Sequence, residues 1–161
     1  IAKKNSENFS SKIIFKTGNC ESTGLEGEKF DLVYGSGILH HLKLEKAIIE
    51  IKRVLKKEGK IVFVEPLGTN PLINLYRKLT PGSRSPDEHP FVNSDFDLIG
   101  KYFENINIKY YGFLTLVFLP FYRSRNNSYV FKILKSLDQF LFRFYIFRFF
   151  AWSFLITAKK N

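Results

Sequence analysis

Two glycines and two histidines stand close together in FDLVYGSGILHHL, residues 30–42, at the end of an apolar run. Glycines at such a place form a phosphate-cradling loop or the rim of another ligand pocket, whereas neighbouring histidines suggest a metal site. A dinucleotide loop needs a further glycine where this chain has His40. The stretch therefore favours a turn whose backbone, at Gly35, Ser36 and Gly37, lies against a ligand.

The spacing of the histidines argues against a metal site. His40 and His41 are adjacent, so on a helix their side chains point about 100° apart. The third histidine, His89, stands far along the chain beside Asp87 and Glu88. Histidine and carboxylate ligands fit a metal by type alone, but we expect one packed and one exposed histidine at positions 40 and 41, and we predict no metal.

The elements that must position this turn follow a β-α-β order. Residues 12–18, 30–35 and 60–65 are rich in β-branched and aromatic residues, which predicts three strands. Residues 44–59 place apolar side chains on one helical face and end at Gly59, a suitable C-terminal cap. This order predicts an α/β fold with a parallel sheet covered on both faces, and ligands bind beyond the carboxyl ends of such strands.

A long polar segment follows, residues 66–92, and its length is typical of a functional loop or lid. Within it, residues 71–79 predict a short helix with Asn70 as the N-cap and Pro71 in the first turn. A further helix is expected after Ser94, capped by that residue together with Asp97.

The last third of the chain is strongly aromatic. Residues 106–119 predict a strand that continues into an apolar stretch, residues 128–150 an amphipathic helix, and residues 152–160 a final strand. Residues 137–156 are almost apolar enough to span a membrane, but Asp138 and two arginines interrupt them. Three interpretations stay open for the helix: it packs on its own domain or over an apolar substrate pocket, it makes peripheral contact with a membrane, or it spans the membrane.

Composition narrows the class of protein. The single cysteine, Cys20, excludes an intramolecular disulfide and suggests a reducing, cytoplasmic location. A net charge of +10 is compatible with binding to nucleic acid, to an anionic membrane or to an anionic substrate. No nucleic-acid-binding motif appears, so no nucleic acid partner is predicted. The chain starts at Ile1 and has no methionine, which suggests a fragment or a processed product.

Three stretches together resemble a known family. GNCE, FDLVYGSGILHHL and EIKRVLKKEGKIVFVEP, in this order and spacing, are similar to the middle of class I S-adenosylmethionine-dependent methyltransferases with a generic methyltransferase domain. The resemblance covers residues 10–70. It implies a Rossmann-like open sheet that is incomplete here, with the first strands missing and the last strand antiparallel. Residues 1–161 would form the C-terminal two-thirds of one domain, with a loop or lid insertion at about 66–92 and a helical aromatic insertion at about 114–150.

The resemblance also implies a cofactor site for S-adenosylmethionine. Asn19 and Cys20 would meet the adenine, with Asn19 standing where the family usually has aspartate. The remaining cofactor-binding residues would line or flank the methionine end: Gly35, Ser36, Gly37, Ile38 and Leu39. The family's glycine-rich loop and ribose-binding acid fall before Ile1, so we expect this chain to bind the cofactor weakly or not at all.

Candidates for the acceptor side lie mainly in the long loop. His89, Glu88 and Glu65 are candidate catalytic residues, since each could move a proton. The candidate substrate residues are Tyr76, Arg77, Arg84 and Asp87. The alternative is a loop held only by its own salt bridges and prolines. We therefore expect methyl transfer to a small-molecule or lipid-linked acceptor; the alternative is a non-catalytic binding module or a basic membrane-surface protein of the same fold.

Overall fold

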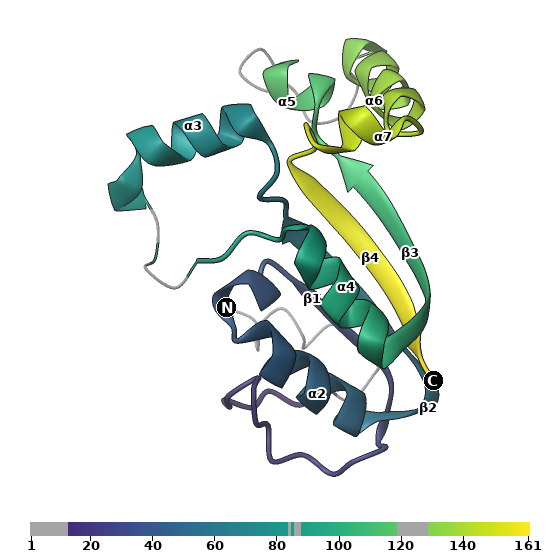
Figure 1. Ribbon diagram of the computed structural model, residues 1–161. Coiled ribbons are helices and arrows are strands. Elements are labelled where there is room, and N and C mark those ends of the chain that lie inside the picture. Colours follow the sequence, from purple (N-terminus) through teal and green to yellow (C-terminus); the bar gives the residue numbers. More distant parts are fainter. Residues whose placement is uncertain (1–12, 84, 86–87, 119–128) are drawn as a thin grey trace.

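Four strands form one open sheet in the computed structural model, which describes residues 13–83, 85, 88–118 and 129–161 (Figure 1). The strands are β1 (Phe30–Ser36), β2 (Leu55–Pro66), β3 (Phe103–Tyr111) and β4 (Ser153–Lys160), and they lie in the order β1-β2-β4-β3. β1 and β2 are parallel, whereas β4 runs antiparallel to β2 and to β3. The α/β fold and the antiparallel last strand are thereby confirmed.

Helices α2 (Leu44–Val54) and α4 (Asn93–Tyr102) cover one face of this sheet (Figure 1). The core lies between them and the strands, and it includes Ile48, Ile51, Ile61, Phe63, Ile99, Phe154 and Ile156. The opposite face carries Leu32 and Tyr34, and Tyr34 is 79% exposed. We expected both faces to be covered; in the part of the chain that the structure describes, only one is.

The end of α2 differs from the sequence prediction. The helix stops at Val54, and Leu55 is already extended, with φ −72° and ψ 138°. Leu55 is fully buried and pairs with Phe30 of β1 as the first residue of β2. Gly59 is therefore not a helix cap. Burial of Leu55 against the neighbouring strand outweighs the helical periodicity of this segment.

Two further local predictions were wrong. Residues 13–18 form no strand, and Ile13, Ile14 and Phe15 are exposed. A strand needs a neighbour to pair with, and no described segment lies beside this one. Helix α4 begins at Asn93, and the carboxylate of Asp95, rather than Ser94 or Asp97, accepts the hydrogen bond from the Val92 N–H at 2.8 Å.

Helix α3 (Pro71–Leu79) begins as predicted. The Asn70 side-chain oxygen accepts hydrogen bonds from the N–H groups of Leu72 and Ile73, and Pro71 occupies the first turn. Asn70 is itself buried and donates from Nδ2 to the Phe150 carbonyl oxygen at 2.6 Å. The start of α3 is thus tied to the segment that precedes β4.

In its described part, the aromatic segment between β3 and β4 forms three short helices rather than one long helix. They are α5 (Leu114–Phe118), α6 (Tyr129–Leu141) and α7 (Tyr145–Arg148), gathered at one end of the sheet (Figure 1). Residues 119–128 lie outside the described part. Within the described residues, no helix has the length and apolar character needed to cross a bilayer.

Asp138 joins α6 to α5. In the sequence it interrupts the apolar stretch of residues 137–156. Its side chain is buried, with 2% of the residue exposed. The carboxylate accepts hydrogen bonds from the N–H groups of Phe113, Leu114 and Thr115 and from the Thr115 hydroxyl. Helix α5 therefore has its unpaired N-terminal N–H groups satisfied by a charge from another helix.

We predict that Asp138→Asn lowers the free energy of unfolding by about 2 kcal/mol, because one acceptor oxygen becomes an NH₂ group facing backbone donors. Urea unfolding followed by circular dichroism measures the change. Ser136→Ala, at an exposed position of the same helix, is the control and should stay within about 0.5 kcal/mol. Equal stability of Asp138→Asn and the parent chain would contradict this role.

Candidate functional site

The turn that follows β1 depends on two glycines. A Cβ atom on Gly35 would lie 2.6 Å from the Phe63 ring, so only glycine fits there. Gly37 has φ +62°, a conformation that other residues rarely adopt. The Gly37 N–H donates to the Val64 carbonyl oxygen at 2.8 Å, which extends the β1–β2 pairing into the turn. The backbone at Ser36 and Gly37 is left at the surface.

Glu65, at the carboxyl end of β2, holds this turn from beneath. It is 1% exposed. One carboxylate oxygen accepts hydrogen bonds from the N–H groups of Ile38 and Leu39, both at 3.0 Å. The other lies 2.7 Å from Nδ1 of His40, which is also buried. Glu65 therefore fixes the short 3-10 helix Leu39–His41 and the turn before it.

The loop that carries Asn19 and Cys20 precedes β1 in the chain. Both residues are exposed. The Asn19 side-chain oxygen accepts a hydrogen bond from the Glu21 N–H at 2.9 Å, so Asn19 also shapes its own turn. The Glu21 carboxylate in turn accepts one from the Lys43 N–H at the start of α2. The loop is thus docked on the helix between β1 and β2.

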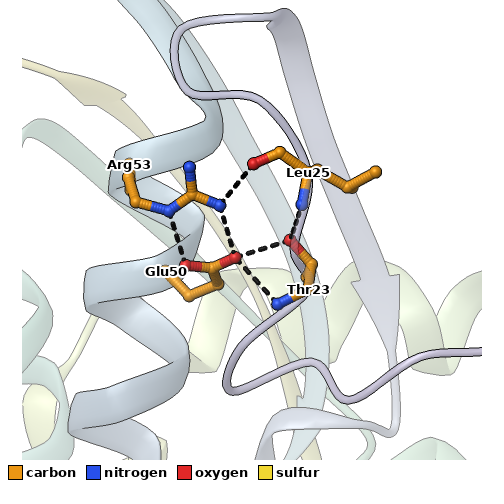
Figure 2. Close-up of polar contacts among 4 residues, drawn as sticks. All are labelled: Thr23, Leu25, Glu50 and Arg53. Atoms are coloured by element: carbon orange, nitrogen blue, oxygen red, sulfur yellow. Dashed lines mark hydrogen bonds and ion pairs between the residues drawn. The ribbon is translucent and has the colours of Figure 1, made fainter.

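A second carboxylate, Glu50 of α2, anchors the far end of that loop (Figure 2). It accepts hydrogen bonds from the Thr23 N–H and hydroxyl at 2.9 and 2.5 Å. Arg53 donates to both of its oxygens at 2.8 Å and also reaches the Leu25 carbonyl oxygen. This cluster was not predicted from the sequence. The three-residue spacing of Glu50 and Arg53 fits a pair on one helix face, but no local pattern identifies Thr23 as their partner.

A cavity of about 410 Å³ opens along the free edge of β1. Its lining is mainly apolar and includes Cys20, Ile38 and Leu39, so three of the predicted cofactor-binding residues share one cavity. Leu32 and Tyr34 of β1 also line it, from the exposed face of the sheet. The other four predicted cofactor-binding residues, Asn19, Gly35, Ser36 and Gly37, are not in the lining.

A smaller cavity of about 240 Å³ brings together residues of the long loop. Arg77, Glu88 and His89 line it, which places three of the predicted acceptor-side residues side by side. Tyr76 is 59% exposed on α3 and does not line this cavity. Arg84 and Asp87 lie outside the described residues.

Direct contacts join this loop to the turn after β1. The His89 N–H donates to the His40 carbonyl oxygen at 2.7 Å. The Ser85 hydroxyl lies 3.3 Å from Nδ1 of His41. The His89 ring approaches the Asp95 carboxylate at 3.4 Å. The two predicted halves of the site, for the methyl donor and for the acceptor, therefore meet at the histidine pair.

The histidine pair itself is arranged differently from our expectation. The two rings lie 4.0 Å apart instead of pointing away from each other, because they sit on a single short turn. His40 contacts Glu65 whereas His41 contacts Ser85. Among the described residues, no three histidine, cysteine, aspartate or glutamate side chains are grouped as metal ligands.

Comparison with known proteins shows similarity to methyltransferases. Residues 1–63 match the sequence model of the methyltransferase domain family. A S-adenosylmethionine-dependent methyltransferase from Archaeoglobus fulgidus is similar in structure, with a TM-score of 0.57 and 21% identity, over 90% of this chain and 66% of that one. No curated protein sequence matches the chain.

Two other solved structures share the fold. A methyltransferase from Thermotoga maritima, described as a possible histamine N-methyltransferase, has a TM-score of 0.62 and 18% identity, over 89% of this chain and 62% of that one. A methyltransferase from Methanosarcina mazei has a TM-score of 0.58 and 20% identity, over 99% of this chain and 75% of its own. The chain thus spans about two-thirds of the length of such relatives.

The fold is the Rossmann-like open sheet that these methyltransferase structures share. The sequence match to the methyltransferase domain family covers residues 1–63 of the 161. The three solved structures are described as S-adenosylmethionine-dependent methyltransferases.

The Glu50 cluster predicts a pH dependence of stability. Its hydrogen bonds with Arg53 and Thr23 lower the pKa of Glu50 from 4.5 to about 2. Because the folded-state pKa is the lower one, the stabilisation is present above the ordinary pKa and disappears as the pH falls towards the folded value. At about pH 7 we expect Glu50→Gln to lose on the order of 2 kcal/mol of unfolding free energy.

Urea unfolding at a series of pH values tests this prediction. The difference between the parent chain and Glu50→Gln should shrink steadily between about pH 5 and pH 2. Glu104→Gln, at an exposed position of β3, removes the same charge and serves as the control. A difference that does not change with pH would contradict the ionic origin of the cluster's contribution.

Proposed function

We propose that the protein transfers the methyl group of S-adenosylmethionine to a small-molecule or lipid-linked acceptor. The observation that carries this proposal is the contact between the two halves of the site. Glu65 fixes the turn at Ile38 and Leu39, and the same histidine pair receives the loop through the His89–His40 backbone hydrogen bond. Direct contact between the turn proposed for the donor and the loop proposed for the acceptor suits a transfer between two bound molecules.

The residues of the turn fit the cofactor. The backbone at Ser36 and Gly37 is accessible, and the absence of a side chain at Gly37 lets a ligand lie against it. In the same cavity, Cys20 would lie beside the adenine, and Ile38 and Leu39 would supply an apolar wall towards the methionine end. The cofactor supplies the sulfonium-bound methyl group. The protein aligns it with the nucleophile and excludes water.

On the acceptor side we assign different roles to the predicted residues. His89 and Glu88 line the loop cavity and are placed to accept a proton from an acceptor bound there. Arg77 lines the same cavity and suits an anionic group of the acceptor. Glu65 has both oxygens engaged with the turn, so in this proposal it is a positioning residue.

An apolar acceptor is supported by a third cavity of about 320 Å³, near the start of β4. Leu116, Phe131 and Trp152 contribute to its lining. Ser153 is also in the lining, and it pairs with Pro66 at the end of β2. The cavity therefore lies at the end of the sheet where the long loop begins. A lipid-linked acceptor could place its chain there. The exposed single cysteine, Cys20, supports a reducing, cytoplasmic setting.

We predict that S-adenosylhomocysteine binds to this chain in the millimolar range, corresponding to about 4 kcal/mol of binding free energy. Titration followed by amide NMR should shift the signals of Cys20, Gly35, Gly37, Ile38 and Leu39. Gly37→Val should abolish these shifts because valine strains the turn and fills the ligand's place.

Gly82→Ala is the matched control, because a Cβ atom there meets no other atom within 4 Å. It should bind like the parent chain, and the NMR spectrum of each variant shows whether the fold is kept. Shifts confined to other residues, or an unchanged titration in a folded Gly37→Val, would contradict the assigned cofactor site.

A further inference from the structure

Helix α6 carries an apolar face that the rest of the described chain does not cover. Its members are exposed by 44 to 76% and are Tyr129, Val130, Ile133, Leu137 and Phe140. Counted from Tyr129, the other four follow after one, four, eight and eleven residues, and this spacing places all five on one side of the helix. We call these five residues the apolar face of α6.

This exposure does not come from a helix that has failed to pack. The other side of α6 already faces the domain through Phe131, Leu134, Asp138 and Leu141, which are partly or fully buried. Asp138 in particular fixes α6 to α5 by four hydrogen bonds. The helix therefore has two apolar sides, one packed and one open, and a surface helix needs only the first for its fold.

The sequence around α6 carries charge of nearly one sign. Between residues 112 and 152 the sequence has six basic residues and a single acidic one. That acidic residue is the buried Asp138, whereas Lys132, Lys135 and Arg143 are exposed. At about 100° per residue, Lys132 flanks the apolar face and Lys135 lies farther around the helix, where it lines the cavity near the start of β4. Arg143 follows the end of the helix. The surface offered by this segment is consequently both apolar and cationic.

We propose that the apolar face of α6 docks on an anionic lipid bilayer, with the helix lying in the plane of the interface. Apolar and aromatic side chains would enter the boundary between headgroups and acyl chains, and the lysines would meet anionic headgroups. A second copy of this chain is a poorer occupant. A symmetric dimer through this face would bring its cationic residues against one another.

The position of α6 in the fold determines which other segment would lie near the bilayer. Tyr111, at the end of β3, and Pro66, at the end of β2, both pair with Ser153. The helical segment that follows β3, which includes α6, and the long loop that follows β2 therefore start at the same end of the sheet. Figure 1 shows α3 and the α5–α7 helices at this same end of the molecule. A docked α6 would hold the acceptor loop near the bilayer surface. The docking itself does not depend on methyl transfer.

Co-sedimentation of the full chain with vesicles tests the proposal. One set is pure phosphatidylcholine, and the other contains about one-third phosphatidylserine, an anionic lipid. We expect binding to the anionic set that weakens with added salt. Lys132→Gln/Lys135→Gln/Arg143→Gln should reduce partitioning about a hundredfold. Ile133→Ser/Leu137→Ser/Phe140→Ser should reduce it by at least about tenfold.

Two controls make these results specific. Lys57→Gln/Lys60→Gln/Lys101→Gln removes the same net charge from exposed positions outside the α5–α7 segment and should bind almost as the parent chain does. Leu75→Ser/Leu79→Ser removes exposed apolar residues of α3 and should also bind. Circular dichroism confirms that each variant is folded.

Three results would overturn the proposal. The first is no binding to anionic vesicles. The second is an equal loss of binding in the control lysine variant, which would show that net charge alone is responsible, or in the α3 variant, which would move the contact to α3. The third is a dimer in sedimentation experiments that the apolar variant dissociates, without any vesicle binding, which would identify a second copy as the occupant.

Discussion

The buried carboxylate of Glu65 is the interaction on which the site depends. Burial of a charge is unfavourable unless hydrogen bonds replace its hydration, and here three are present: the N–H groups of Ile38 and Leu39, and the His40 ring. The same contacts give the turn after β1 its shape. Through His40 they also reach His89 and the long loop that follows β2. One side chain at the end of β2 thus sets the turn after β1 and the place where the loop docks.

Two other buried acids work by the same principle. Glu50 holds the loop that carries Asn19 and Cys20, and Asp138 holds α5 against α6. In each case a carboxylate on a regular element accepts a hydrogen bond from at least one backbone N–H group of a neighbouring segment. Loops cannot bury their backbone without such partners. The functional segments of this protein are therefore positioned chiefly by charges from neighbouring helices and strands.

Local sequence patterns predicted the elements whose causes are local. The β1 strand, most of α2, the buried part of β2 and the Asn70 cap each follow from periodicity or from one capping residue. The predictions were wrong where contacts between residues distant in sequence determine the secondary structure. Leu55 belongs to a strand because Phe30 lies beside it, and residues 13–18 form no strand because no described segment pairs with them.

In the candidate site, too, local features could be predicted and long-range contacts could not. The glycines of the turn were recognisable by type, whereas the roles of its acids were not. Glu65 was predicted as a candidate base because a carboxylate at a strand end often faces a ligand. Its actual partners are backbone groups more than twenty residues earlier in the chain, which no local pattern reveals. Glu50 was missed for a similar reason, since Thr23 lies far from it in sequence.

Native-state hydrogen exchange at the Ile38 and Leu39 amides tests the central claim most directly. If Glu65 holds the turn, both amides should be protected in the parent chain to nearly the same degree as the amide of Phe63 in β2. In Glu65→Gln their exchange should be at least about tenfold faster while Phe63 stays protected. Exchange of both amides in the parent chain as fast as in an exposed loop, or no change in Glu65→Gln, would contradict the account.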